Sequence, residues 1–244
     1  MIQDILSVIW KEFRELVNLR GQRRGGLMSI LILVGVFGVF MPLQNGQEWF
    51  ATPIPIFYYG WLPFILVSSV IADSFAGERE RHTLDTLLAS RLSDTAILYG
   101  KILAALAYGW GLTMLCAVLG VAAINLAFGH GKFLFYPAEI ALGIFAFSLL
   151  VSGFVSGLGV LISLRAASVR QAQQTFSIAF FAIFVPFFAI PLLPEEWVNK
   201  ATQVLQNLDY RTLGTLFALL LLVADLVLLG AARMRFRRDR LSLD

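Results

Sequence analysis

The sequence predicts an all-α integral membrane protein with six transmembrane helices, an N-terminal amphipathic interfacial helix and a short helix in the first cytoplasmic loop. Three observations support this prediction. Of the 244 residues 58% are hydrophobic and only 14% are charged, and the mean hydropathy is +0.77. Apolar stretches of the length that a bilayer requires recur along the chain. Basic residues gather in the segments that would lie on one side of the membrane.

Six apolar stretches are long enough to cross the hydrocarbon core of a bilayer, which takes roughly 20 residues per helix. The third is longer than a span requires, so its first turns are expected to project from the membrane. A β-barrel would alternate apolar and polar residues, and these stretches do not. The transmembrane domain is therefore predicted to occupy residues 25–244, with spans at Leu27–Leu43, Pro53–Ser74, Ile97–Phe128, Pro137–Leu164, Phe176–Leu193 and Leu213–Ala232.

The orientation follows from the positions of the cations, because Lys and Arg near a span are retained in the cytoplasm. Sixteen of the 19 precede the first span or follow the second, fourth or sixth, and only Lys132, Lys200 and Arg211 fall on the other side. Both termini are therefore predicted to be cytoplasmic. The net charge of +3 reflects this topology and an affinity for anionic membrane lipids, so no nucleic-acid partner is predicted.

Residues 1–24 form a separate element ahead of the first span. Their apolar side chains recur at steps of three and four, which is typical of an amphipathic helix lying on a membrane surface. Two roles are open for this helix: a plain surface anchor, or a lever that also touches a cytoplasmic partner. Its apolar face comprises Ile2, Ile5, Leu6, Ile9, Phe13, Leu16 and Val17.

The loop at about residues 76–96, between spans two and three, is the most informative stretch. Thr83 is expected to cap a short helix that begins at Leu84, with Asp85 in its first turn, where the helix dipole favours an anion. Ser93 is expected to cap the helix that follows. Leu84, Leu87 and Leu88 would form one apolar edge of the short helix, beside the run Glu78, Arg79, Glu80 and Arg81, whose charges alternate in sign.

The segment from Glu80 to Ser90, followed by Gly100-Lys101, resembles the first cytoplasmic loop of ABC type-2 exporter permeases. The layout is also similar: such permeases have an amphipathic N-terminal helix, six spans and a coupling helix that docks on an ATPase subunit. The chain departs from the usual pattern at three positions, with His82 for glycine, Asp85 for glutamate and Arg91 for proline. The resemblance implies that ATPase coupling involves Glu80, Thr83, Leu84, Asp85, Leu87 and Leu88, and the charged run adds Glu78 and Arg81.

The chain is expected to lack a motor and any catalytic site of its own. The phosphate-binding pattern Gly-x-x-x-x-Gly-Lys-Ser/Thr is absent, because Gly100-Lys101 and Gly131-Lys132 are followed by apolar residues. With two histidines, a His-rich metal site cannot form within one chain. By the resemblance, ATP and Mg²⁺ are bound by a separate ATPase, and a second permease subunit, identical or homologous, completes the pathway in a bacterial-type cytoplasmic (inner) membrane.

Polar residues inside the predicted spans are candidate pathway sites. Ser152 and Ser156 belong to a row of small residues in span four, which lets helices approach closely. Packing within the chain is the simpler interpretation of this row, and a dimer face or pathway lining is the alternative. Asp225 lies well inside span six, where a charge costs at least ~2.5 kcal/mol, so it is expected to be protonated, paired or in contact with water.

The segment at about residues 186–210 is predicted to form an outer re-entrant or interfacial element. Pro186 and Pro191 cannot donate backbone hydrogen bonds and so favour a break near the outer leaflet. Trp197, Val204 and Leu208 then share one helical face.

Two other classes of function are considered. A secondary transporter or channel would work without an ATPase, but it would be expected to show inverted repeats or several intramembrane charges, and only Asp225 is clearly placed there. An intramembrane enzyme would need a convergent set of His, Asp, Ser or Cys groups. The ATP-driven permease is therefore the preferred prediction.

Overall fold

The computed structural model describes the chain except for residues 1, 23, 190–193, 195–197, 199–209 and 237–244. All regular secondary structure in the described residues is helical, which confirms the predicted all-α class. The elements are α1 (Ile2–Gln22), α2 (Arg24–Gly35), the π-helix η1 (Val36–Phe40), α3 (Met41–Asn45), α4 (Glu48–Ala51), α5 (Ile54–Glu80), α6 (Leu84–Leu88), α7 (Asp94–Phe128), α8 (Ala138–Ser163), α9 (Val169–Ala189) and α11 (Tyr210–Arg235).

Five helices within the described residues are long and apolar enough to cross a membrane, namely Gly26–Asn45, Ile54–Glu80, Asp94–Phe128, Ala138–Ser163 and Arg211–Arg235. They coincide with predicted spans one to four and six. The predicted fifth span overlaps α9, whose described part ends at Ala189, and its last residues lie outside the described part of the chain, as does most of the predicted outer segment at 186–210.

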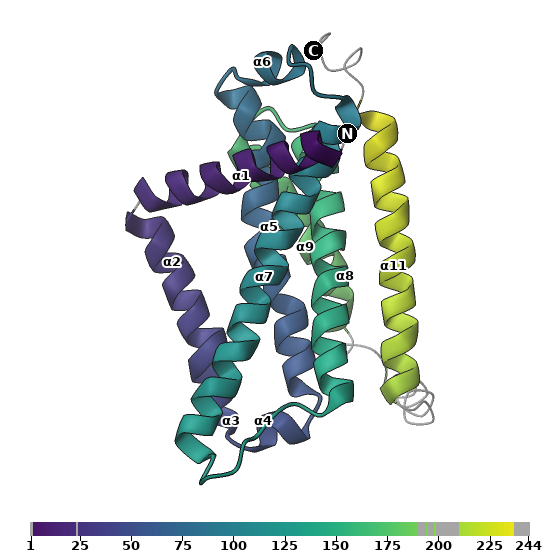
Figure 1. Ribbon diagram of the computed structural model, residues 1–244. Helices are drawn as coiled ribbons and strands as arrows, with labels where there is room; N and C mark the ends of the chain where they lie inside the picture. The colour runs from purple at the N-terminus through teal and green to yellow at the C-terminus, as the bar shows by residue number, and fades with distance from the viewer. Residues whose placement is uncertain (1, 23, 190–193, 195–197, 199–209, 237–244) are drawn as a thin grey trace.

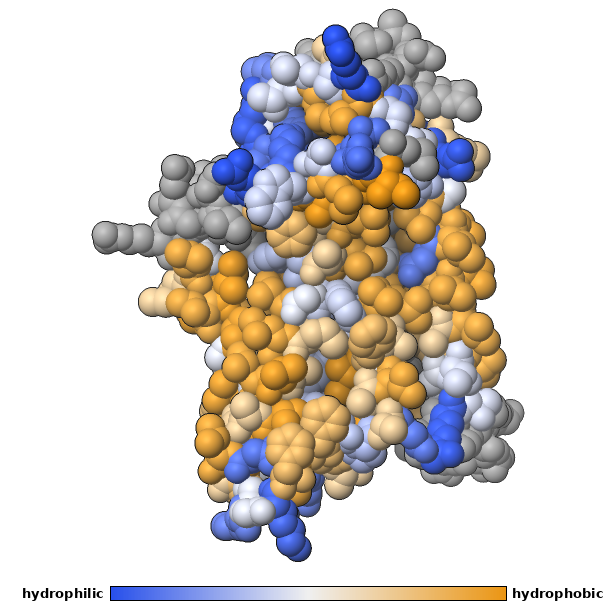
Figure 2. Space-filling view, viewed as in Figure 1, coloured by the Kyte–Doolittle hydropathy of each residue, from blue (hydrophilic) through white to orange (hydrophobic). Residues whose placement is uncertain are grey.

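The helices are arranged as a bundle with one helix lying across its end (Figure 1). Helices α5, α7, α8 and α11 run along the bundle, whereas α1 crosses it near the end that carries α6. Figure 2 shows an apolar band across the middle of this face and hydrophilic residues gathered at the two ends. Exposed large apolar side chains on α2 and α11 contribute to the apolar surface, including Leu31, Ile32, Leu220 and Leu226. This surface suits a protein that has lipid as its solvent.

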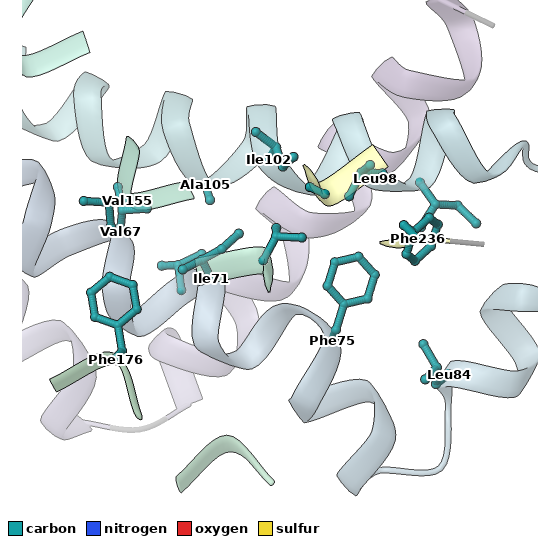
Figure 3. Close-up of a cluster of buried hydrophobic side chains, with 14 residues drawn as sticks. Val67, Ile71, Phe75, Leu84, Leu98, Ile102, Ala105, Val155, Phe176 and Phe236 are labelled. Atoms are coloured by element: carbon teal, nitrogen blue, oxygen red, sulfur yellow. The ribbon is translucent and has the colours of Figure 1, made fainter. Parts of the chain in front are cut away.

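A buried apolar cluster joins the helices toward the α6 end (Figure 3). It includes Ile71 and Phe75 of α5 and Ile102 of α7, and α8 and α9 also contribute side chains. Ser163, at the end of α8, donates a hydrogen bond to the carbonyl of Ala72 (3.0 Å) and accepts from the backbone N–H groups of Phe75 and Ala76 (3.1 and 3.0 Å). The last turns of α5 and α8 are therefore joined by packing and by hydrogen bonds.

Candidate functional site

The loop after α5 begins with a hydrogen-bonded turn that ends the helix. The backbone N–H of Thr83 donates to the carbonyl of Glu78 at 2.9 Å, and that of His82 donates to Arg79 at 3.1 Å. This pair of bonds is the Schellman motif, in which the residue just past the helix adopts a left-handed conformation. His82 does so with φ of 56°. The permeases that this loop resembles usually have glycine at this position, so His82 keeps the turn while carrying a Cβ.

We expect His82→Gly to raise the free energy of unfolding by about 0.5–1 kcal/mol. The left-handed conformation costs roughly 1–2 kcal/mol for a residue with a Cβ, and the greater chain entropy of glycine offsets part of the gain. Chemical denaturation of the purified protein in detergent, followed by tryptophan fluorescence, measures the change. His82→Ala is the matched control, because it removes the imidazole and keeps the Cβ. An equal gain from alanine would contradict the strain at this position.

The short helix α6 forms where the sequence predicts it and packs its apolar edge onto the bundle. Leu84 is buried and Leu87 is partly buried against the cluster of Figure 3, which shows Leu84 at its edge. The side chains of Asp85 and Leu88 lie outside the described part of the chain. Thr86 and Ala89 are exposed on the other side of the helix. The leucines therefore fix α6 to its own chain and leave Thr86 and Ala89 exposed.

Capping is confirmed at one of the two predicted positions. The hydroxyl of Ser93 accepts the backbone N–H of Ala96 at 3.2 Å and so caps α7. The hydrogen bond found for the hydroxyl of Thr83 instead returns to α5, where it donates to the carbonyl of Glu78 at 3.3 Å. Thr83 thereby adds a hydrogen bond to the C-terminal end of α5, just before α6 begins.

The charged run at the end of α5 is engaged mainly within the chain. Arg79 donates to the carbonyls of Ala166 (2.5 Å) and Leu164 (3.1 Å), which follow α8. The carboxylate of Glu80 accepts the backbone N–H of Val169 at 3.0 Å and so caps α9. Arg81 pairs with Asp73 at 3.4 Å on the surface. The alternating signs thus join the α8–α9 connection to α5.

A buried ionic cluster, which the sequence interpretation missed, joins α1, α5 and α7. Lys101 of α7 is only 2% exposed. Its ammonium group lies 2.7 Å from Oε1 of Glu12, 3.1 Å from Oε1 of Glu78 and 2.9 Å from the carbonyl of Ser74. It also lies 5.2 Å from the centre of the Phe75 ring, within range of a cation–π interaction. A lysine inside the apolar start of α7 was the signal in the sequence, but its partners are far away along the chain.

Lys11 extends this cluster to the surface of α1. Its ammonium lies 2.8 Å from the same Oε1 of Glu78 and 3.3 Å from Glu15. Burial by itself would lower the pKa of Lys11, but the hydrogen bond and charge of Glu78, with Glu12 and Glu15, outweigh burial and raise this pKa above 10.5. Its contribution to stability is therefore complete below the unfolded-state pKa and is lost only as the pH rises through the higher folded-state value.

Helix α1 approaches α7 closely beside this cluster. A Cβ added at Gly100 would lie 2.6 Å from Cβ of Val8, which is itself 2% exposed. Glycine is therefore required for this contact, whereas the same α7 helix carries Gly111, where an added Cβ meets nothing within 4 Å.

Comparing these two glycines tests the contact. Gly100→Ala is expected to lower the free energy of unfolding by about 1–3 kcal/mol, because it overpacks the α1–α7 contact. Gly111→Ala is expected to raise it by up to about 1 kcal/mol through helix propensity. Denaturation of both variants in the same detergent measures the difference. If the two substitutions act alike, α1 does not pack on α7 at Gly100.

Of the three candidate residues inside the spans, Ser152 and Ser156 are buried in α8 and Asp225 lies on α11. Ser152 donates to the carbonyl of Ser148 at 2.7 Å, so its hydroxyl is satisfied within its own helix. Asp225 faces α8, where a Cβ added to Gly153 would lie 2.9 Å from its Oδ2. The hydroxyl of Ser156 and Oδ1 of Asp225 are buried without a hydrogen-bond partner among the described residues. Ser152 is therefore satisfied within α8, whereas Asp225 and Ser156 bring polar atoms that have no partner in the described part of the chain into the apolar bundle.

Polar contacts join the parts of the site to one another. The cluster centred on Lys101 connects α1 to α5 and α7, the Schellman turn connects α5 to α6, and Arg79 connects α5 to the α8–α9 connection. Within the described residues no group of three His, Cys, Asp or Glu side chains is placed to hold a metal ion. Short polar contacts therefore join α1, α6 and the α8–α9 connection to the long helices α5 and α7.

The sequence of this chain is similar to those of known transport proteins. Residues 40–206 match the family described as ABC-2 family transporter protein. The chain is 31% identical over 167 residues to the probable multidrug ABC transporter permease YbhR of Escherichia coli K12, covering 67% of this chain and 40% of that protein. It is 26% identical over 151 residues to the ABC transporter permease protein NatB of Bacillus subtilis 168, covering 56% of this chain and 38% of that protein. The matches thus span about two fifths of these relatives. No solved structure matches.

Proposed function

Because the chain belongs to the ABC-2 family of transporter proteins, we propose that it is the permease subunit of an ATP-driven exporter, coupled to separate cytoplasmic ATPase subunits. The observation that carries the proposal is the ionic cluster of Lys101, Glu12 and Glu78, which joins α1 to the two long helices flanking α6. A buried ionic cluster costs desolvation, so it favours a defined geometry more than stability. Such a geometry is what a mechanical connection needs.

The proposed topology has six spans, and α9 forms the first part of the fifth. The α6 end of the bundle lies on the cytoplasmic side of an inner membrane. The cation distribution supports this orientation, because most Lys and Arg residues belong to segments at or near that end. Residues 1–24 then lie along the cytoplasmic surface as an elbow helix, and Lys101 connects that helix to the bundle.

The proposed docking surface is the exposed side of α6 and its flanking turns. Arg81, Thr86 and Ala89 present it, while Leu84 and Leu87 hold the helix from behind. Glu78, Glu80 and Thr83 are proposed to act on coupling by fixing the support, and Asp85 and Leu88 keep the coupling role that the family resemblance implies. ATP and Mg²⁺ would be bound by the ATPase, with no cofactor in this chain.

In the proposed cycle, ATP-driven closure of two ATPase subunits pushes α6 and α1. The push passes through Glu78 and Lys101 into α5 and α7, and changes access at the interface between two permease subunits. This chain performs no bond chemistry. Asp225, Ser152 and Ser156 are proposed as polar points of the pathway; Asp225→Asn should then change transport at an unchanged protein yield, and unaltered transport would oppose that role.

The test adds bulk and charge to the docking surface without touching its support. Thr86→Arg with Ala89→Arg is expected to weaken co-purification with the ATPase and its stimulation by the permease about tenfold, the effect of losing one strong interface contact. Ala51→Arg with Ala138→Arg adds the same charge on exposed residues at the opposite end and is the matched control.

Three results would overturn the proposal. One is equal coupling by the two double variants. Another is failure of the full-length chain to associate with any ATPase. The third is substrate flux driven by an ion gradient in ATP-free vesicles, which would favour a secondary transporter.

A further inference from the structure

A groove opens between α8, α9 and α11 at the α6 end of the bundle. Its volume is about 350 Å³. Arg165 and Arg235 line it, and the deeper part is apolar, with Leu158 and Ile162 from α8 and Ala231 from α11. Thr175 of α9 completes the lining.

The groove is graded from charged to apolar along the bundle. Arg235 is the last residue of α11 and Arg165 lies just beyond the end of α8, so both guanidinium groups lie toward the α6 end. Leu158 and Ala231 lie one to two turns further toward the middle of their helices. Neither arginine has a carboxylate within 4.0 Å among the described residues. Among the described residues, then, no carboxylate competes with an anion for the two guanidinium groups, and the apolar wall suits a hydrocarbon chain.

From this grading we propose that the groove is a binding site for an anionic phospholipid, with the phosphate between Arg165 and Arg235 and one acyl chain along Leu158 and Ala231. Guanidinium groups bind phosphate oxygens through charge-assisted, often bidentate hydrogen bonds. Basic pockets between spanning helices on the cytoplasmic side are suited to anionic headgroups. The site rests on the proposed orientation, in which the α6 end faces the cytoplasm.

Lipid is favoured over a protein segment by the combination of depth and charge. The two arginines lie toward the ends of their helices, and the apolar lining residues lie further toward the middle. A phospholipid has the same order, with a charged headgroup followed by acyl chains. Arg79 and Glu80 are already bound to the α8–α9 connection beside it, so that connection is fixed in place. A lipid wedged here would contact α11 and the two helices against which it lies.

Native mass spectrometry of the full-length protein in a mild detergent tests the site. The probes are palmitoyl-oleoyl phosphatidylglycerol, phosphatidylcholine with the same chains, and glycerol phosphate, which has the headgroup charge without the chains. We expect phosphatidylglycerol to bind best. Arg165→Gln with Arg235→Gln should weaken its binding about 25-fold, since each cation near a membrane surface contributes roughly a factor of five. Phosphatidylcholine binding should change little.

The matched control is Arg170→Gln with Arg233→Gln, which removes two exposed cations, one on α9 and one on α11, that do not line the groove. Ala231→Phe fills the apolar part at constant charge and should weaken both lipids. Equal loss in the two double-arginine variants would overturn the site, as would binding of glycerol phosphate as strong as that of phosphatidylglycerol. Lipid exclusion by a second copy or by the ATPase would also overturn it.

Lipid retention is measured without ATP or an ATPase, so a failure here is distinguishable from a failure of coupling. Accessibility of a cysteine placed at Arg165 in sealed inside-out and right-side-out vesicles separately reports the orientation on which the site rests. Labelling from the outer side would overturn the orientation, and with it the lipid site as proposed.

Discussion

Lys101→Met is expected to lower the free energy of unfolding by about 3–5 kcal/mol and to abolish the stimulation of the ATPase. Removing one partner of a buried ionic group leaves its counter-charges uncompensated, which accounts for a loss of that size. Glu78 is 3% exposed and keeps, among the described residues, Lys11 alone as an ionic partner, and Glu12 loses its 2.7 Å contact. Denaturant unfolding by tryptophan fluorescence measures the stability, and ATP hydrolysis by the reconstituted complex measures the coupling.

Two further variants separate the loss of a charge from the loss of packing. Lys101→Met combined with Glu12→Gln and Glu78→Gln should recover much of the lost stability, because the carboxylates that lacked a counter-charge are now neutral. It should not recover coupling, because the connection between α1 and α7 is still absent. Lys132→Met, at an exposed lysine between α7 and α8, is the control and should be close to neutral. Full stability in the single variant would show that Lys101 is not buried among these groups.

Gly159→Ala is expected to have the second-largest effect, a loss of about 2–3 kcal/mol. A Cβ at this position would lie 2.1 Å from Cγ2 of Ile71, deep in the contact between α5 and α8. Overpacking of an ordered core costs about 1–3 kcal/mol, and a rigid β-branched neighbour that is fully buried places the cost at the upper end. Thermal unfolding in detergent measures it.

A compensating substitution tests the cause. Ile71→Ala, which removes Cγ2, combined with Gly159→Ala should be more stable than the sum of the two single changes predicts, because residues in contact show interaction energies of about 0.5–3 kcal/mol. Gly230→Ala in α11, where an added Cβ meets nothing within 4 Å, is the control and should be neutral or stabilising. Strict additivity of the two changes would mean that α5 and α8 do not meet at this point.

Gly159 joins two helices by packing, whereas Lys101 joins helices by charge. Under the proposed function, both contacts would help to carry force through the molecule. At Gly159 and Ile71, α5 and α8 are in close contact, because a small residue lets two helix backbones approach each other. The ionic contacts of Lys101 with Glu12 and Glu78 join α7 to α1 and to α5. A variant of Gly159 should therefore lower stability first and coupling only in proportion, whereas Lys101→Met with neutralised carboxylates should separate the two properties.

The amino-acid sequence by itself determined what depends on short-range patterns. Hydropathy placed predicted spans one to four and six on helices that are long and apolar enough to cross a membrane. It could do so because a bilayer demands about 20 apolar residues wherever it is crossed. The start of α6 at Leu84 and the cap of α7 by Ser93 also follow from neighbouring residues. The family was visible in one loop for the same reason.

Only the tertiary structure decided which polar groups meet. Lys101 is 89 positions from Glu12 and 23 from Glu78. The residues within one helical turn of each therefore do not predict that these three side chains meet. The direction of Leu84 was undecided for a related reason: an apolar edge is equally suited to a partner protein or to its own bundle, and the packing of α5 determined that it turns inward. Helical periodicity fixes a face, but only the folded neighbours fix what that face touches.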